Sequence, residues 1–241
     1  MYTTNLNVPT PDGDMDCYIA TTDEHTARPA VILYMDVPGI RPELERFAQR
    51  IAEAGYLCVL PDLYYRNGRV RFDLRKGEEE LKRMFAVGGA LTVDMVMRDT
   101  RGILDWLSES AQATDRTGII GYCMSGQFVV AAAGAFPERI HASASLYGTR
   151  IVTDAENSPH LMARNASAEL YLGFAAHDPY VEDHVVPTLA EALTSAGVRH
   201  TIETHPDTEH GFCFPERPAY VEAAAESVWE TVFDLYARNL H

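Results

Sequence analysis

Continuous apolar stretches alternate with amphipathic stretches along most of the chain. Residues 30–35 and 56–60 are almost entirely apolar, which is typical of strands that are covered on both faces of a parallel sheet. Between them, apolar residues recur at helical spacing from Leu44 to Ile51, and Gly55 follows as a helix stop. This strand–helix–strand order predicts βαβ units.

The N-terminal segment has a different pattern. Apolar and polar residues alternate on both sides of the turn residues 11–14, which predicts an antiparallel hairpin. Further along we expect strands at 117–122, 140–146, 169–174 and about 199–204, and helices at 93–107, 123–135, 183–196 and 218–239. The chain is therefore predicted to be one α/β domain over residues 1–241, with a mostly parallel twisted sheet, helices on both faces and an antiparallel N-terminal hairpin.

Residues 66–91 interrupt this alternation with a charged, glycine-containing segment, in which one short helix is expected around 78–85. Residues 66–83 contain seven basic and four acidic side chains, a net charge of +3. Charge runs are usually solvated surface, and we interpret this one as a surface excursion. The rival interpretation is a lid whose arginines, Arg69, Arg71 and Arg75, attract an anionic substrate.

Composition narrows the class of protein. The 241 residues are 46% hydrophobic and 23% charged, as in soluble globular proteins, and the net charge is −15. Such acidity argues against binding of nucleic acid or of an anionic membrane surface. No signal peptide is visible and no apolar stretch approaches the length of a membrane span. Four scattered cysteines do not form a disulfide framework, so we expect a cytoplasmic protein.

The most informative position is Cys123, where a predicted strand runs directly into a helix. Gly121 and Ser125 flank it at two residues on either side, and small residues are needed there in the sharp turn called a nucleophile elbow. A helix N-terminus also stabilises a thiolate. The alternative is a buried, inert cysteine, which is our interpretation of Cys17 and Cys58.

A nucleophile needs a histidine base, and the base needs an orienting acid. Asp178 follows a predicted strand, and His210, followed by glycine, lies between the last strand and the last helix. This order, nucleophile then acid then histidine, is that of the α/β-hydrolases. The weaker candidates are Asp183 and Asp207 for the acid, and His205 and His177 for the base.

Other classes of function find less support. The G-x-G-x-x-G motif of dinucleotide-binding folds is absent after the first parallel strand, at residues 36–41. His205, His210 and Cys213 match no common zinc spacing, and we expect neither a metal nor a cofactor. An inactive member of the fold, or a redox-sensing thiol at Cys123, remains as an alternative.

Five short strings in order along the chain carry a family resemblance: 36–39 (DVPG), 61–64 (PDLY), 121–124 (GYCM), 177–179 (HDP) and 210–212 (HGF). On these strings the chain resembles the dienelactone hydrolase family, α/β-hydrolases with a Cys-Asp-His triad. The resemblance implies an α/β-hydrolase fold in which Cys123 attacks, His210 moves the proton and Asp178 orients His210. It also implies an oxyanion hole made by the backbone N–H groups of Val37 and Met124.

The chain departs from the family pattern at three places. Ser125 stands where glycine is usual, and Asp36 stands where the family often has a glutamate near the thiol. Phe214 stands where members that act on dienelactone have an arginine that grips the substrate carboxylate. The nearest arginine is Arg217, and Asp36 and Arg217 are therefore our candidate substrate-binding residues. The departures favour a general ester or lactone substrate, cleaved through an acyl-enzyme, over dienelactone itself. Acyl transfer or C–C bond chemistry with the same triad is the alternative, and nothing in the sequence predicts the oligomeric state.

Overall fold

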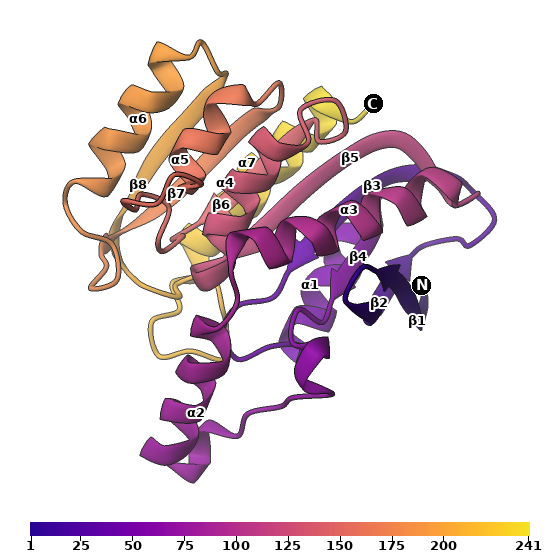
Figure 1. The fold of residues 1–241 in the computed structure, drawn as a ribbon, viewed down its shortest axis with the longest axis horizontal. Coiled ribbons are helices and arrows are strands. Elements are labelled where there is room, and N and C mark those ends of the chain that lie inside the picture. Colours follow the sequence, from indigo (N-terminus) through magenta and orange to yellow (C-terminus); the bar gives the residue numbers. More distant parts are fainter. The chain divides into compact units, whose positions relative to one another are not determined.

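The computed structural model describes residues 1–241, without the side chain of Leu74, and the chain forms two units, Met1–Asp115 and Arg116–His241 (Figure 1). Each unit is built from strands with helices packed against them. The sequence pattern predicted the order of these elements well, and the main differences lie at their ends.

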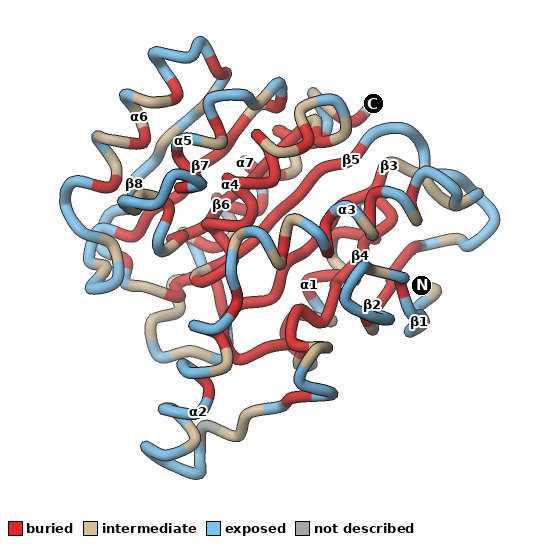
Figure 2. Tube along the Cα trace, in the orientation of Figure 1, coloured by how far each residue is buried: buried red, intermediate tan, exposed pale blue. Residues whose placement is uncertain are grey.

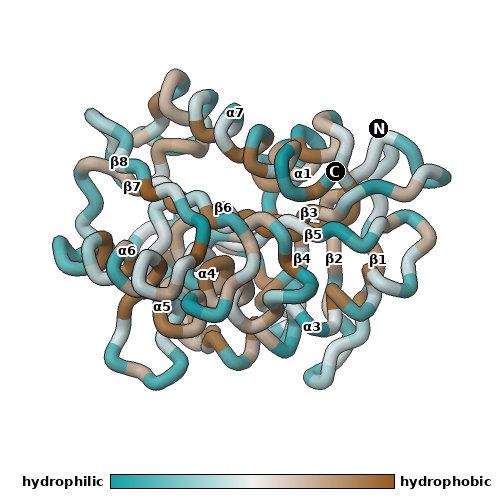
Figure 3. Tube along the Cα trace, turned by 90° about the horizontal axis from the view of Figure 1, so that it is seen from above, coloured by the Kyte–Doolittle hydropathy of each residue, from teal (hydrophilic) through white to brown (hydrophobic). Residues whose placement is uncertain are grey.

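The first unit begins with the predicted hairpin, β1 (Tyr2–Thr10) and β2 (Gly13–Thr21), which pair in antiparallel register. β2 pairs antiparallel with β4 (Leu57–Pro61), and β4 pairs parallel with β3 (Arg28–Tyr34), giving the strand order β1-β2-β4-β3. Helix α1 (Pro42–Glu53) covers one face of these strands and α3 (Val93–Glu109) covers the other (Figure 3).

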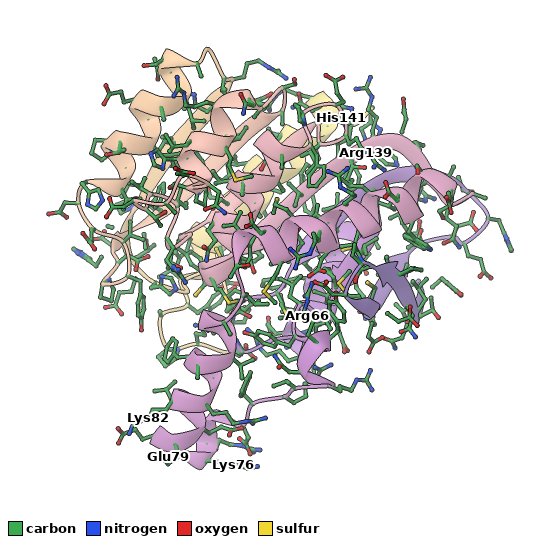
Figure 4. The ribbon with its side chains drawn as sticks, viewed as in Figure 1. Arg66, Lys76, Glu79, Lys82, Arg139 and His141 are labelled. Carbon is green, nitrogen blue, oxygen red and sulfur yellow. The ribbon has the colours of Figure 1, made fainter. Side chains whose placement is uncertain are left out.

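The charged segment of the first unit contains two short 3-10 turns, Tyr65–Asn67 and Leu74–Lys76, and helix α2 (Glu78–Gly89). The helix is four residues longer than the sequence pattern predicted. It extends away from the strands of its own unit and is mostly exposed (Figures 1 and 2). Lys76, Glu79 and Lys82 lie near its outer end, where Lys82 forms ion pairs with the acidic residues of the first turn (Figure 4).

The basic side chains of this segment are largely paired within the first unit. Arg66 lies inward (Figure 4) and forms ion pairs with Asp12 and with the fully buried Asp99. The three arginines considered for an anion-attracting lid are also engaged with carboxylates: Arg69 with Asp16, Arg71 with Asp62, and Arg75 with Asp73. Paired guanidinium groups attract an additional anion less than free ones do.

The second unit consists of parallel strands in the order β5-β6-β7-β8: β5 (Ala113–Tyr122), which begins at the end of the first unit, β6 (Ala142–Leu146), β7 (Glu169–His177) and β8 (His200–Glu209). Helices α4 (Gly126–Ala135) and α6 (Val185–Ser195) lie on one face, and α7 (Glu222–Asn239) lies on the other (Figure 3). A short helix α5 (Pro159–Met162) and a 3-10 turn (Ala163–Asn165) were not predicted.

The burial pattern explains why the strand predictions succeeded. Every residue of β4 and β6 is buried, as their nearly continuous apolar and small residues require (Figure 2). β7 and β8 continue three and five residues beyond their predicted ends. Most of these final residues are exposed, and those of β8 are mostly polar, so the hydrophobic pattern did not reveal them. The extra length carries both strands to the residues of the candidate site.

Candidate active site

Cys123 occupies the predicted turn between a strand and a helix. It directly follows β5 and begins a 3-10 turn, Cys123–Ser125, that leads into α4. Its φ angle is 55°, in the left-handed region that non-glycine residues seldom adopt. Such a conformation costs on the order of 1–3 kcal/mol, and it persists only where the surrounding structure holds it.

The small residues around Cys123 are needed for packing. A Cβ atom on Gly121 would lie 2.7 Å from Cγ2 of Val129 and 3.1 Å from Cβ of Ser125. Ser125 is fully buried and fits because Gly121 has no side chain. A Cβ on Gly126 would lie 2.3 Å from the Cα of Gly148, so the residue after Ser125 must also be glycine. The serine at 125 is thus compatible with the turn.

Hydrogen bonds hold the turn to the neighbouring loop and to α4. The N–H of Thr149 donates to the carbonyl of Cys123 over 3.1 Å, and the Gln127 side-chain amide donates to the carbonyl of Met124 over 3.0 Å. Tyr147 begins the loop with a φ of 37°, and its N–H donates to the Gly173 carbonyl over 2.6 Å. The turn at Cys123 and the loop bonded to it therefore each contain a residue with a strained backbone conformation.

Asp178 and His210 meet at the ends of two neighbouring strands. Asp178 directly follows β7 and His210 directly follows β8. Nδ1 of His210 donates to Oδ2 of Asp178 over 2.8 Å, and both side chains are over 90% buried. The other carboxylate oxygen of Asp178 accepts the backbone N–H of Tyr180 over 2.9 Å. The carboxylate is therefore held from two sides.

The electrostatics of His210 link it to the cysteine. Burial disfavours the imidazolium, but the hydrogen bonds and charges of Asp178 and Cys123 outweigh burial and raise the pKa of His210 to about 9. Nε2 of His210 is buried, and the thiol of Cys123 lies near enough to contribute to the raised pKa of the ring. The imidazole thus has a carboxylate as one partner and a thiol as the other.

Aromatic rings pack against the imidazole of His210. The ring of Tyr147 lies 5.0 Å from it and the ring of Tyr180 lies 4.8 Å from it, both in edge-to-face arrangements. Tyr147 is completely buried, whereas Tyr180 is 56% exposed. Neither tyrosine was among the site residues predicted from the sequence. Only the position of Tyr180, two residues after Asp178, could have drawn attention to it.

An open cavity of about 610 Å³ lies beside the imidazole. Its lining residues come from the ends of β7 and β8 and from the loops that follow them: His177, Asp178, Pro179, Tyr180, Glu209 and His210. A small molecule in this cavity would contact the histidine and its aspartate partner.

The rival acids and bases lie in other surroundings. His205 is buried in β8, where its Nε2 lies 3.0 Å from the hydroxyl of Tyr171, and burial lowers its pKa. His177 is exposed at the end of β7, and Asp183 and Asp207 are exposed. Among the acids and bases considered, Asp178 and His210 are the pair that the structure brings together with Cys123.

The other three cysteines are buried, and Cys123 alone among the four is partly exposed. Burial raises the pKa of the thiols of Cys17, Cys58 and Cys213. Cys213 also interacts with the hydroxyl of Tyr147 by a hydrogen bond, which works against that rise. A reactive thiolate is therefore disfavoured at these three positions.

In the first unit, Asp36 and Val37 lie in a tight turn after β3. The carboxylate of Asp36 is fully buried and forms an ion pair with Arg41, with Oδ2 lying 3.2 Å from Nη2. The N–H of Gly39 donates to the carbonyl of Asp36 over 2.9 Å, and the hydroxyl of Tyr64 donates to the carbonyl of Val37 over 2.6 Å. These bonds fix the peptide groups of the turn.

Arg217 and Phe214 lie close to the residue that follows His210. The guanidinium carbon of Arg217 lies 5.2 Å from the ring centre of Phe214. The side chain of Arg217 also covers Gly211, where an added Cβ would lie 2.9 Å from its Cδ. Gly211 has a φ of +93°, so both its backbone conformation and the packing of Arg217 restrict this position to glycine.

The described residues contain no group of three or more histidine, cysteine or acidic side chains arranged to hold a metal ion. Among the described helices, none combines the length and the apolar character needed to cross a membrane.

Comparison with known proteins places these features in one family. Residues 15–240 match the model of the dienelactone hydrolase family. A Salmonella typhi protein named as a candidate carboxymethylenebutenolidase is 25% identical over 236 residues, which cover 96% of this chain and 86% of that protein. The carboxymethylenebutenolidase of Rhodococcus opacus is 24% identical over 240 residues, covering 96% of this chain and 89% of that protein.

Solved structures show the same fold. The structure of a candidate dienelactone hydrolase from Klebsiella pneumoniae aligns with a TM-score of 0.87 at 23% identity, covering 98% of each chain. The dienelactone hydrolase-like promiscuous phosphotriesterase P91, from metagenomic libraries, aligns with a TM-score of 0.80 at 17% identity, covering 100% of each chain. The predicted α/β-hydrolase fold is therefore confirmed.

Proposed function

Because the chain belongs to the dienelactone hydrolase family and is a hydrolase of ester or lactone bonds, we propose that it acts through a covalent thioester on Cys123. The observation that carries this proposal is the position of His210, whose imidazole interacts with the carboxylate of Asp178 and with the thiol of Cys123. A thiol, a base and an orienting acid in this order form the basis of nucleophilic acyl transfer.

The proposed reaction has two halves. The thiolate of Cys123 attacks the carbonyl carbon, a C–S bond forms and the carbonyl π electrons move to oxygen. When the oxyanion collapses, the C–O bond breaks, and the leaving alkoxide takes a proton from Nε2 of His210. Water then attacks the thioester, His210 takes a proton from that water, and the thiolate leaves. For a lactone, the alkoxide formed in the first half stays attached to the acyl group.

The orienting role of Asp178 follows from its contacts. Its carboxylate accepts the Nδ1 proton of His210 and the N–H of Tyr180, so the imidazole keeps the tautomer and orientation in which Nε2 serves the thiol. The imidazolium that forms during the reaction is also stabilised by this buried negative charge.

We assign the oxyanion hole to the backbone N–H groups of Met124 and Val37. Met124 lies in the turn that leads into α4, where the helix dipole favours negative charge. The peptide at Val37 is held by the Tyr64 hydroxyl. Loss of one such donor typically costs about 10²–10³ in rate.

Asp36 and Arg217 are the proposed substrate-binding residues outside the triad: Asp36 stands at the position of the family's glutamate, and Arg217 is the arginine nearest to the position of the family's substrate-binding arginine. The packing of Arg217 over Gly211, next to His210, supports a place for Arg217 at the rim of the site.

Since the family model spans residues 15–240, we also propose that both units form one catalytic domain. A free thiol nucleophile suits a reducing compartment such as the cytoplasm.

The proposal is tested by trapping the acyl-enzyme. Protein mixed with p-nitrophenyl acetate and quenched in acid should carry one acetyl group on Cys123, located by peptide mass spectrometry. Cys123→Ala should show no burst of p-nitrophenol and no adduct, whereas Cys213→Ala, which removes a buried thiol, should keep both. An acetyl group on another residue, or turnover that survives in Cys123→Ala, would show that the nucleophile lies elsewhere.

A further inference from the structure

The cavity beside His210 contains an acidic side chain that the proposed mechanism does not use. Glu209 is the last residue of β8, is exposed and lines the cavity. No described residue forms a hydrogen bond or ion pair with its carboxylate, in contrast with Asp178, which is bonded to His210 and to Tyr180. Glu209 is therefore an available anion at the wall of a site for small molecules.

An exposed aromatic ring forms another part of the wall. Tyr180 contacts the imidazole with an interplanar angle of 67°, and it remains 56% exposed. The face of a tyrosine ring is electron-rich and attracts cations, especially organic ammonium groups, while its carbon atoms also exclude water from them. An aromatic ring and a carboxylate on one cavity wall are a combination suited to a cationic ligand.

The remaining charges of the cavity do not reverse this preference. A positive charge on His210 is balanced by its hydrogen-bond partner Asp178, so Glu209 leaves the cavity wall with net negative charge. The lining residues include no lysine or arginine. The chain as a whole carries −15, which adds long-range attraction for cations.

The proposed function tells which part of a substrate would lie here, and the inference rests on it. In the proposed function His210 protonates the leaving oxygen, and the cavity is a space that the imidazole ring lines, so we place the alcohol portion of an ester there. We propose that this cavity is the alcohol-side subsite, that it prefers esters of alcohols bearing an ammonium group, and that Tyr180 and Glu209 determine this specificity.

The test compares two esters that differ in charge and not in shape. Acetylcholine and its uncharged isostere 3,3-dimethylbutyl acetate are each incubated with the intact protein, and acid release is followed in a pH-stat. The wild-type kcat/KM should favour acetylcholine by about five- to tenfold, and high salt should reduce that preference. Glu209→Gln and Tyr180→Leu should each lower the ratio by about three- to fivefold.

A matched control is Glu191→Gln, which removes an exposed acid on α6 that does not line the cavity, and it should keep the wild-type ratio. A protein that forms the acetyl-enzyme with p-nitrophenyl acetate but does not prefer acetylcholine overturns the subsite and leaves the nucleophile in place. A ratio unchanged in Glu209→Gln, or lowered equally in Glu191→Gln, also overturns it. Failure to acylate Cys123 at all overturns the proposed function instead.

Discussion

Asp178 and His210 are joined by a hydrogen bond of 2.8 Å, although 31 residues separate them in the sequence. They meet because β7 and β8 are neighbouring parallel strands, so the residues that follow the two strands emerge at the same edge of the sheet. The bond lies away from solvent, where hydrogen bonds between charged groups are strong.

Removal of the Asp178 charge should slow the reaction. Asp178→Asn keeps the shape of the side chain but allows the wrong tautomer of His210, and it should lower kcat for p-nitrophenyl acetate by about 10²–10⁴-fold. The alkylation of Cys123 by iodoacetamide should slow as well. Asp183→Asn, at an exposed acid five residues later, serves as the control and should react as the wild type does. Equal losses in both variants would remove Asp178 from its assigned role.

The raised pKa of His210 predicts how stability depends on pH. The imidazole has a pKa of about 9 in the folded protein and an ordinary value near 6.5 when unfolded. Between about pH 6.5 and 9, His210 is protonated in the folded protein and neutral in the unfolded protein. The stabilisation that this proton gives is therefore fully present below about pH 6.5 and is lost as the pH rises through about 9. The loss is on the order of 3 kcal/mol.

This dependence can be measured by urea unfolding at pH 6 and pH 9.5. The free energy of unfolding of the wild type should fall between these values by more than that of His210→Ala, which has no imidazole to titrate. Parallel changes in the two proteins would mean that the proton on His210 is not linked to folding.

The packing around Gly121 predicts a steric effect on the turn at Cys123. In Gly121→Ala the new methyl group would collide with Val129, which should destabilise the protein by about 1–3 kcal/mol and displace the thiol. Gly89→Ala is the matched control, since nothing lies within 4 Å of a Cβ atom added in α2, and its Tm should equal or exceed that of the wild type. Thermal unfolding and the rate of Cys123 acylation check both variants, and a fully active Gly121→Ala would contradict the prediction.

The hydroxyl of Tyr64 should matter for rate more than for substrate binding. Tyr64→Phe loses the bond to the Val37 carbonyl and loosens the turn whose N–H we assign to the oxyanion hole, so kcat should fall by roughly tenfold with little change in KM. Tyr34→Phe removes another buried tyrosine hydroxyl, which is bonded to Thr100, and it should lower stability without this loss of kcat. A similar kcat in the two variants would argue that Tyr64 is only structural.

The sequence determined the order of the elements because burial dictates residue type. Central strands such as β4 must be apolar throughout, and the turn at Cys123 admits only small neighbours, so both leave a local pattern that can be read without a structure. Asp178 was predicted just beyond a strand end, and His210 in the loop between the last strand and the last helix. The final residues of β7 and β8 were not readable as strand, because hydrogen bonding to a neighbouring strand does not require apolar side chains.

Only the tertiary structure decided which groups face each other. It placed His205 against Tyr171 and His210 against Asp178, a choice that spacing alone left open. It also paired the arginines of the charged segment with carboxylates, and it brought Tyr180 and Glu209 to one cavity wall from the loop after β7 and the end of β8. Contacts between residues distant in the chain depend on strand order and register, and these are set by the packing of the whole fold rather than by any local pattern.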